Sequence, residues 1–102
     1  MIAGYLTTPA YAAFHRWLGR GDALADMWTA WAAGDRKAAN AAVSDEVVDA
    51  LILHGSPERC RAQLAAYADA GVTTPVAALL PGPDAGTPEA TLAAVEAVAP
   101  AR

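Results

Sequence analysis

The chain has 102 residues, with 7 Lys and Arg against 11 Asp and Glu and a net charge of −4. This length allows one domain at most. The acidic balance, without a basic run, argues against a nucleic-acid partner, which needs clustered Lys and Arg to neutralise phosphates. Hydrophobic residues make up 55 % of the chain, but half of them are alanines, which favour helices and contribute little transfer energy when buried. We therefore expect a mostly helical chain that has few large apolar side chains with which to form a core.

Several further classes of protein are excluded by simple counts. Cys60 is the only cysteine, so neither an internal disulfide nor a cysteine-based zinc site can form, and His15 and His54 show no metal-ligand spacing. No apolar run approaches the roughly 18 residues of a membrane-spanning helix, and no charged region precedes an apolar stretch at the N-terminus. We expect no metal, no membrane partner and a cytoplasmic location. Six Arg against one Lys, with abundant Ala, suggest a GC-rich bacterial genome.

The first half of the chain carries clear helix signals. Thr8 followed by Pro9 predicts a helix start and Gly19 its end. Asp22, Asp35 and Ser44 are predicted to start the next three helices. The expected helices span 9–18, 23–33, 36–42 and 45–51, and residues 52–54 are expected to be extended. Their spacing predicts apolar faces formed by Tyr11, Phe14, His15 and Leu18 in the first helix and by Leu24, Met27, Trp28 and Trp31 in the second.

The second half has a different pattern. Ser56-Pro57 and Thr87-Pro88 are the same start signal 31 residues apart, and they predict helices over 57–70 and 88–98. Gly71 suits the left-handed cap of the first of these helices. Residues 75–80 form an apolar run without alternation, which is typical of a parallel strand buried on both faces. Such a strand needs a neighbour on each edge, so the sequence indicates part of a larger α/β sheet or barrel.

These segments resemble a known family in their order and spacing. His54-Gly55-Ser56-Pro57-Glu58, then Tyr67 to Val72, then Thr74-Pro75-Val76, are similar to the C-terminal stretch of luciferase-like oxidoreductases, flavin- or deazaflavin-dependent monooxygenases and reductases. The likeness is greatest to the branch that depends on coenzyme F420. Tyr5 to Tyr11 and Leu18 to Gly21 resemble the insertion that precedes this stretch.

The resemblance implies a C-terminal fragment of a (β/α)₈ TIM barrel, an α/β fold, with one or two short strands in this chain. Residues 1–54 would be a helical insertion after barrel strand seven, and residues 55–102 would hold helix seven, strand eight and helix eight. The complete barrel would transfer hydride between coenzyme F420, or alternatively FMN, and a small organic substrate. The isolated chain is expected to bind no cofactor and to be inactive alone. It would be a gene fragment, a misplaced start or half of a split enzyme.

The candidate site residues follow from the expected position of the insertion over the barrel mouth. Tyr5, Tyr11 and His15 are predicted to line the substrate pocket of the complete enzyme, because inserted segments after a barrel strand fold over its mouth. The simpler reading of His15 is a surface histidine beside Arg16. Cys60 lies on an apolar stripe and is read as a structural cysteine. No catalytic residue matches a family motif, and the cofactor contacts are unknown.

A second function class stays open. The chain is alternatively a small non-catalytic helical remnant or association module. In either case the isolated chain lacks the neighbouring strands that would flank Val76, Leu79 and Leu80 of the expected strand. It also lacks the barrel wall that Leu92 and Val95 of the last helix would cover. We expect the isolated chain to self-associate through this apolar surface.

Overall fold

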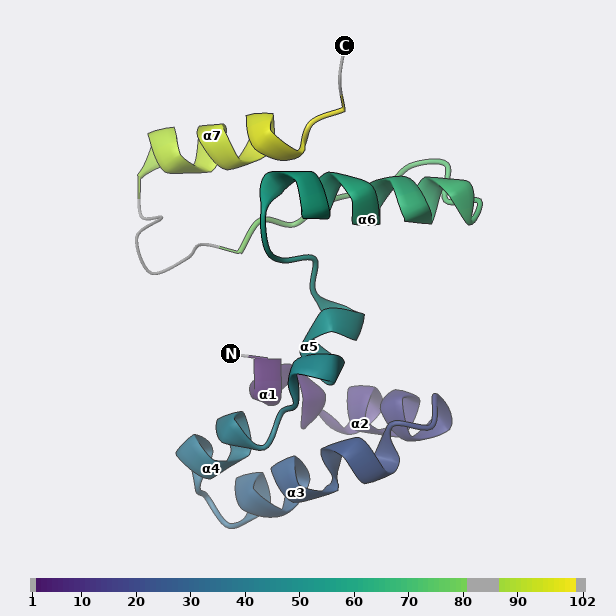
Figure 1. The fold of residues 1–102 in the computed structure, drawn as a ribbon. Helices are drawn as coiled ribbons and strands as arrows, with labels where there is room; N and C mark the ends of the chain where they lie inside the picture. Colours follow the sequence, from purple (N-terminus) through teal and green to yellow (C-terminus); the bar gives the residue numbers. More distant parts are fainter. Residues whose placement is uncertain (1, 81–86, 101–102) are drawn as a thin grey trace. The chain divides into compact units, whose positions relative to one another are not determined.

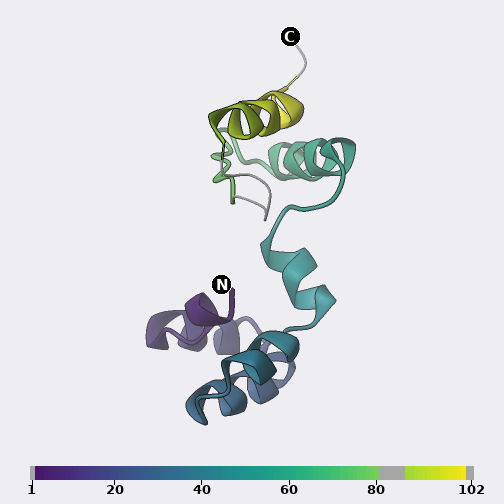
Figure 2. The ribbon, with the colours of Figure 1, turned by 90° about the vertical axis from the view of Figure 1, so that its left-hand side faces the viewer.

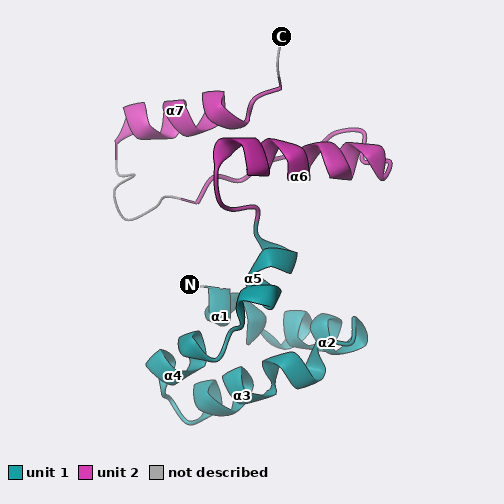
Figure 3. Cartoon of the chain, in the orientation of Figure 1, with its two compact units in different colours: residues 1–52 teal, residues 53–102 magenta. Residues whose placement is uncertain are grey.

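The computed structural model describes residues 2–80 and 87–100, and all the regular secondary structure within them is helical (Figure 1). The chain divides into two compact units, residues 1–52 and 53–102 (Figure 3). All six helices predicted from the sequence are confirmed to within two residues at either end. The seven helices are α1 (Ile2–Leu6), α2 (Pro9–Trp17), α3 (Gly21–Ala32), α4 (Arg36–Ala41), α5 (Asp45–Leu51), α6 (Pro57–Asp69) and α7 (Pro88–Val98).

Most of the predicted helix starts are confirmed by side-chain caps. The Ser44 hydroxyl accepts from the backbone N–H of Val47 at 3.3 Å, and Ser56, Asp35 and Thr87 cap their helices in the same way. Asp22 is an exception, because α3 begins one residue earlier, at Gly21, and Asp22 lies in its first turn. Thr8 precedes α2 as expected, but its side chain makes no capping hydrogen bond.

The end of α6 shows why glycine is required there. Gly71 has a φ of 103°, a left-handed conformation that a side chain would strain. Its N–H donates to the carbonyl of Ala68, and the N–H of Val72 donates to the carbonyl of Tyr67, each at 3.0 Å. This pair of bonds is the Schellman motif, so the predicted left-handed cap is confirmed.

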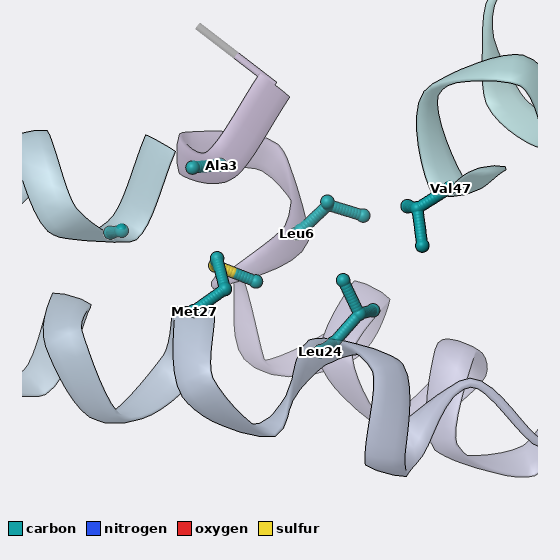
Figure 4. Packing of buried hydrophobic residues seen from close by; sticks show 6 residues of the cluster. Ala3, Leu6, Leu24, Met27 and Val47 are labelled. Carbon is teal, nitrogen blue, oxygen red and sulfur yellow. The ribbon is translucent and has the colours of Figure 1, made fainter. Parts of the chain in front are cut away.

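The core of the first unit is formed by few side chains. Leu24 and Met27 of α3 are the largest fully buried side chains among the described residues. The other members of the cluster come from helices α1, α4 and α5: Ala3, Leu6, Ala39 and Val47 (Figure 4). Trp28 and Trp31 pack against this cluster half-buried, so the predicted apolar face of the second helix is confirmed.

The sequence did not predict α1. No capping residue or proline marks its start, so local signals are missing. Tertiary contacts hold it instead: Ala3 and Leu6 are buried in the core, and the indole N–H of Trp28 donates to the carbonyl of Leu6 at 2.9 Å. A five-residue helix is marginal by itself, so its formation depends on these contacts.

The predicted strand at 75–80 is wrong for the structure of this chain. Residues 75–80 have no regular secondary structure, and neither do residues 52–54, where a second short strand was expected. A β-strand is stabilised by hydrogen bonds to a neighbouring strand, and the described residues contain no other strand. The apolar side chains of the segment are exposed, up to 89 % for Val76.

The second unit nevertheless keeps the order of a βα repeat. Helices α6 and α7 pack on each other and run in the same direction, and the chain returns in the opposite direction after α6 (Figures 1 and 2). No residue of α6 or α7 is fully buried. Leu92 and Val95 are 59 % and 46 % exposed, in keeping with the expectation that they lack the barrel wall that they would cover. Across the described residues, no helix is long and apolar enough to span a membrane.

Candidate functional site

Tyr5 and Tyr11 come together on the surface of the first unit. The α1–α2 turn brings their rings to a centroid separation of 6.5 Å, with the ring planes tilted by 35°. Both side chains are about half exposed or more. The structure thus brings together two of the three predicted pocket residues and presents their rings to solvent, where they can contact an apolar or planar ligand.

His15 takes a different position from the two tyrosines. It is only 7 % exposed, so the reading of His15 as a surface histidine is wrong, and its side chain is less open to solvent than the two tyrosine rings. Its Nδ1 lies 3.3 Å from Nη1 of Arg20, and its carbonyl accepts from the backbone N–H of Arg20 at 2.9 Å. Gly19 turns the chain so that Arg20 folds back on the last turn of α2.

The Arg20 contact fixes the chemistry of the imidazole. A guanidinium can only donate, so Nδ1 accepts and the ring proton of neutral His15 is on Nε2. Burial, and then the nearby Arg20 cation, lower the pKa of His15 below its ordinary value. His15 is therefore a neutral imidazole near pH 7, able to donate one hydrogen bond through Nε2 but unsuited to act as a cation.

Two arginine–tryptophan pairs were missed by the sequence analysis. The Arg16 guanidinium lies 4.2 Å from the ring centroid of Trp28, and that of Arg36 lies 3.7 Å from the ring centroid of Trp31. Arg36 also donates to the carbonyl of Trp31 at 2.9 Å. Arg36 follows Trp31 by only five residues, so a local signal for that pair was present, whereas Arg16 and Trp28 belong to different helices and their pairing is not visible in the sequence. These contacts hold both guanidinium groups over tryptophan rings that pack against the core.

The remaining chemically interesting residues form no site in the structure. Cys60 is a free, half-buried thiol on α6, and His54 is exposed after α5. In residues 2–80 and 87–100, no three His, Cys, Asp or Glu side chains are grouped so that they could hold a metal ion.

A comparison with protein-family models identifies the family of this chain. The model of the luciferase-like monooxygenase family matches residues 1–74, which include the tyrosine pair, His15 and the whole of α6. The chain belongs to the luciferase-like monooxygenase family. Searches of curated proteins and of solved structures found no match.

Membership of this family assigns the chain to an oxidoreductase type. The family implies a TIM barrel, while the described part of this chain is helical and shows no barrel by itself. The family match ends at residue 74, just before the segment 75–80 that was expected to be a strand.

The residues described do not fit a complete flavin-type cofactor. The tyrosine pair offers an aromatic surface for a planar ring, but such nucleotides also carry phosphate, which needs donors held toward it. Arg16 and Arg36 lie over indole rings, and Arg20 contacts His15. Arg61 donates to the carbonyl of Ala97 and to the carboxylate of Glu58. Four arginines in the described part of the chain are thus engaged in contacts within it and are not held toward a phosphate.

Proposed function

We propose that this chain is the C-terminal portion of a luciferase-like oxidoreductase that transfers hydride between a deazaflavin, or alternatively a flavin, and a small organic substrate. The family match over residues 1–74 is the observation that carries the proposal. In this account the chain contributes part of the substrate surface and the end of the barrel, and the other strands contribute most cofactor contacts.

The arrangement of the second unit supports the position assigned to it. In a (β/α)₈ barrel, neighbouring helices run parallel to each other and opposite to the strands between them. Helices α6 and α7 have this relation, with the chain returning between them in sequence (Figure 1). We infer that residues 75–80 become strand eight when neighbouring strands supply hydrogen bonds.

The proposal gives different roles to the three predicted pocket residues. Tyr5 and Tyr11 have exposed rings and hydroxyls and would contact the organic substrate. His15 would act as a positioning residue, because its bond to Arg20 ties the last turn of α2 to the start of α3. In this role it remains neutral throughout.

The test is to join this chain to strands one to seven of a luciferase-like deazaflavin enzyme and to measure substrate-dependent loss of reduced-cofactor absorbance. We expect turnover by the joined protein, with Tyr5→Ala and Tyr11→Ala raising KM by about ten-fold each, as for loss of an apolar contact worth about 1.4 kcal/mol. Tyr67→Ala is the matched control, since Tyr67 is as exposed as Tyr11 but lies on α6, and it should leave KM unchanged. A folded joined protein without turnover would favour the association-module alternative.

A further inference from the structure

The last carbonyl of α1 is bonded to a distant part of the chain. The final four carbonyls of a helix have no donor within it, so each needs another partner. The three carbonyls before that of Leu6 accept from Thr7 or Thr8, just after the helix. The carbonyl of Leu6 instead accepts from the indole N–H of Trp28 at 2.9 Å, across 22 residues of sequence. This hydrogen bond therefore joins the end of α1 to α3.

The same indole ring also contacts α2. The guanidinium of Arg16, near the end of α2, lies 4.2 Å from the ring centroid of Trp28. A cation in this position is attracted by the negative face of the ring. The ring is half-buried and packs against the core of the first unit. One side chain of α3 thus contacts both α1 and α2, the two helices that carry the tyrosine pair.

The tyrosine rings themselves have little packing to hold them. Tyr5 is 64 % exposed and Tyr11 is 49 % exposed, with their ring centroids 6.5 Å apart. Tyr5 directly precedes Leu6, so the bond that holds the Leu6 carbonyl also holds the backbone that carries the Tyr5 ring. A helix of five residues is marginal by itself, so α1 does not fix this position without tertiary contacts.

We propose that Trp28 is a positioning residue of the tyrosine pair. Its N–H holds the end of α1 and its ring holds α2 through Arg16, so that the rings of Tyr5 and Tyr11 stay beside each other. The effect on a substrate is exerted through Tyr5, and this consequence rests on the proposed function. The positioning itself does not, because it concerns contacts within the chain.

Amide hydrogen exchange at single residues of the full chain tests the positioning. Trp28→Phe keeps an aromatic ring for the core and for Arg16 but removes the donor. The Thr7 N–H, whose hydrogen bond of 3.1 Å closes α1, should then exchange about five-fold faster, as for the loss of one hydrogen bond. Cross-relaxation in NMR spectra between the ring protons of Tyr5 and Tyr11 should become weaker in the same variant.

Trp31→Phe is the matched control. Trp31 lies on the same helix, has an arginine over its ring and lies beside α1, since a Cβ on Gly4 would be 3.6 Å from the ring; the bond to Leu6, however, comes from Trp28. Both variants reduce a ring that packs on the core, so exchange in the middle of α3 should become faster in both. Exchange at Thr7 should become faster in Trp28→Phe alone, because α1 opens while α3 stays folded. Equal exchange at Thr7 in the two variants overturns the proposal.

The joined protein tests whether this position matters for the substrate. There, Trp28→Phe should raise KM about three-fold and leave kcat unchanged. In a Tyr5→Ala background it should have no further effect, because it acts through Tyr5. The same increase of KM in both backgrounds, or a change in kcat alone, overturns the proposal. A joined protein without turnover counts against the proposed function only, and the exchange at Thr7 then decides the positioning.

Discussion

The sharpest test of the fold is to remove Leu24 from the core of the first unit. Leu24 has no exposed surface and, with Met27, is one of the two largest fully buried side chains in the described part of the chain. Leu→Ala at such positions destabilises by about 3–5 kcal/mol, because the transfer free energy is lost and a cavity is left. A unit of 52 residues has a total stability of about 3–8 kcal/mol. Leu24→Ala should therefore remove about half or more of that stability.

Tryptophan fluorescence reads this change from one unit only. Trp17, Trp28 and Trp31 all lie in residues 1–52, so their emission during urea unfolding reports on the first unit. With a slope of about 1 kcal/mol per M urea, the midpoint should fall by about 3 M. Leu51→Ala is the control, because Leu51 is 36 % exposed on α5, and it should lower the midpoint by less than about 1 M. Equal shifts for the two variants would refute the assignment of the core.

Three further predictions concern other contacts. Because the pKa of His15 is lowered in the folded chain, the unfolded chain binds the proton more readily. The contribution of His15 to stability should therefore be full above pH 6.5 and fall as the pH drops below it. Urea midpoints measured from pH 7.5 to 5 should show this dependence, and His15→Gln should abolish it. Arg61→Met should remove the hydrogen bond from α6 to the last turn of α7 and destabilise α7 by about 1 kcal/mol. Amide hydrogen exchange should then become faster in α7 and stay unchanged in α3. Val76→Lys with Leu79→Lys should raise the solubility of the isolated chain and reduce its binding of hydrophobic dyes, and unchanged solubility together with loss of cooperative unfolding would mean that these side chains lie in a true core.

The helices could be predicted because their signals are local. Ser44, Ser56 and Thr87 each cap a helix start through their own side chain, and Gly71 ends a helix through its own backbone conformation. Such signals act within one turn, so a single sequence contains them in full.

Most of the errors concern contacts between residues that are distant in the sequence. Residues 75–80 have the composition of a buried strand, but strand formation depends on partners that the described chain lacks. Helix α1 is stabilised because Ala3 and Leu6 pack in the core, and no residue within α1 provides a local signal for this contact. The burial of His15 was also missed, although its contact with Arg20, made after the turn at Gly19, spans only five residues. The exposure of Phe14, which was expected on the same apolar face as His15, was also missed.

A cofactor titration tests most directly the claim that this chain is one part of a luciferase-like oxidoreductase. The fluorescence of a deazaflavin and of FMN would be followed while the 102-residue chain is added, and then while the chain joined to strands one to seven is added. We predict binding with a dissociation constant in the micromolar range for the joined protein and no measurable binding for the chain alone, because Arg16, Arg20, Arg36 and Arg61 are engaged in contacts within the chain. Micromolar binding by the chain alone would contradict the account.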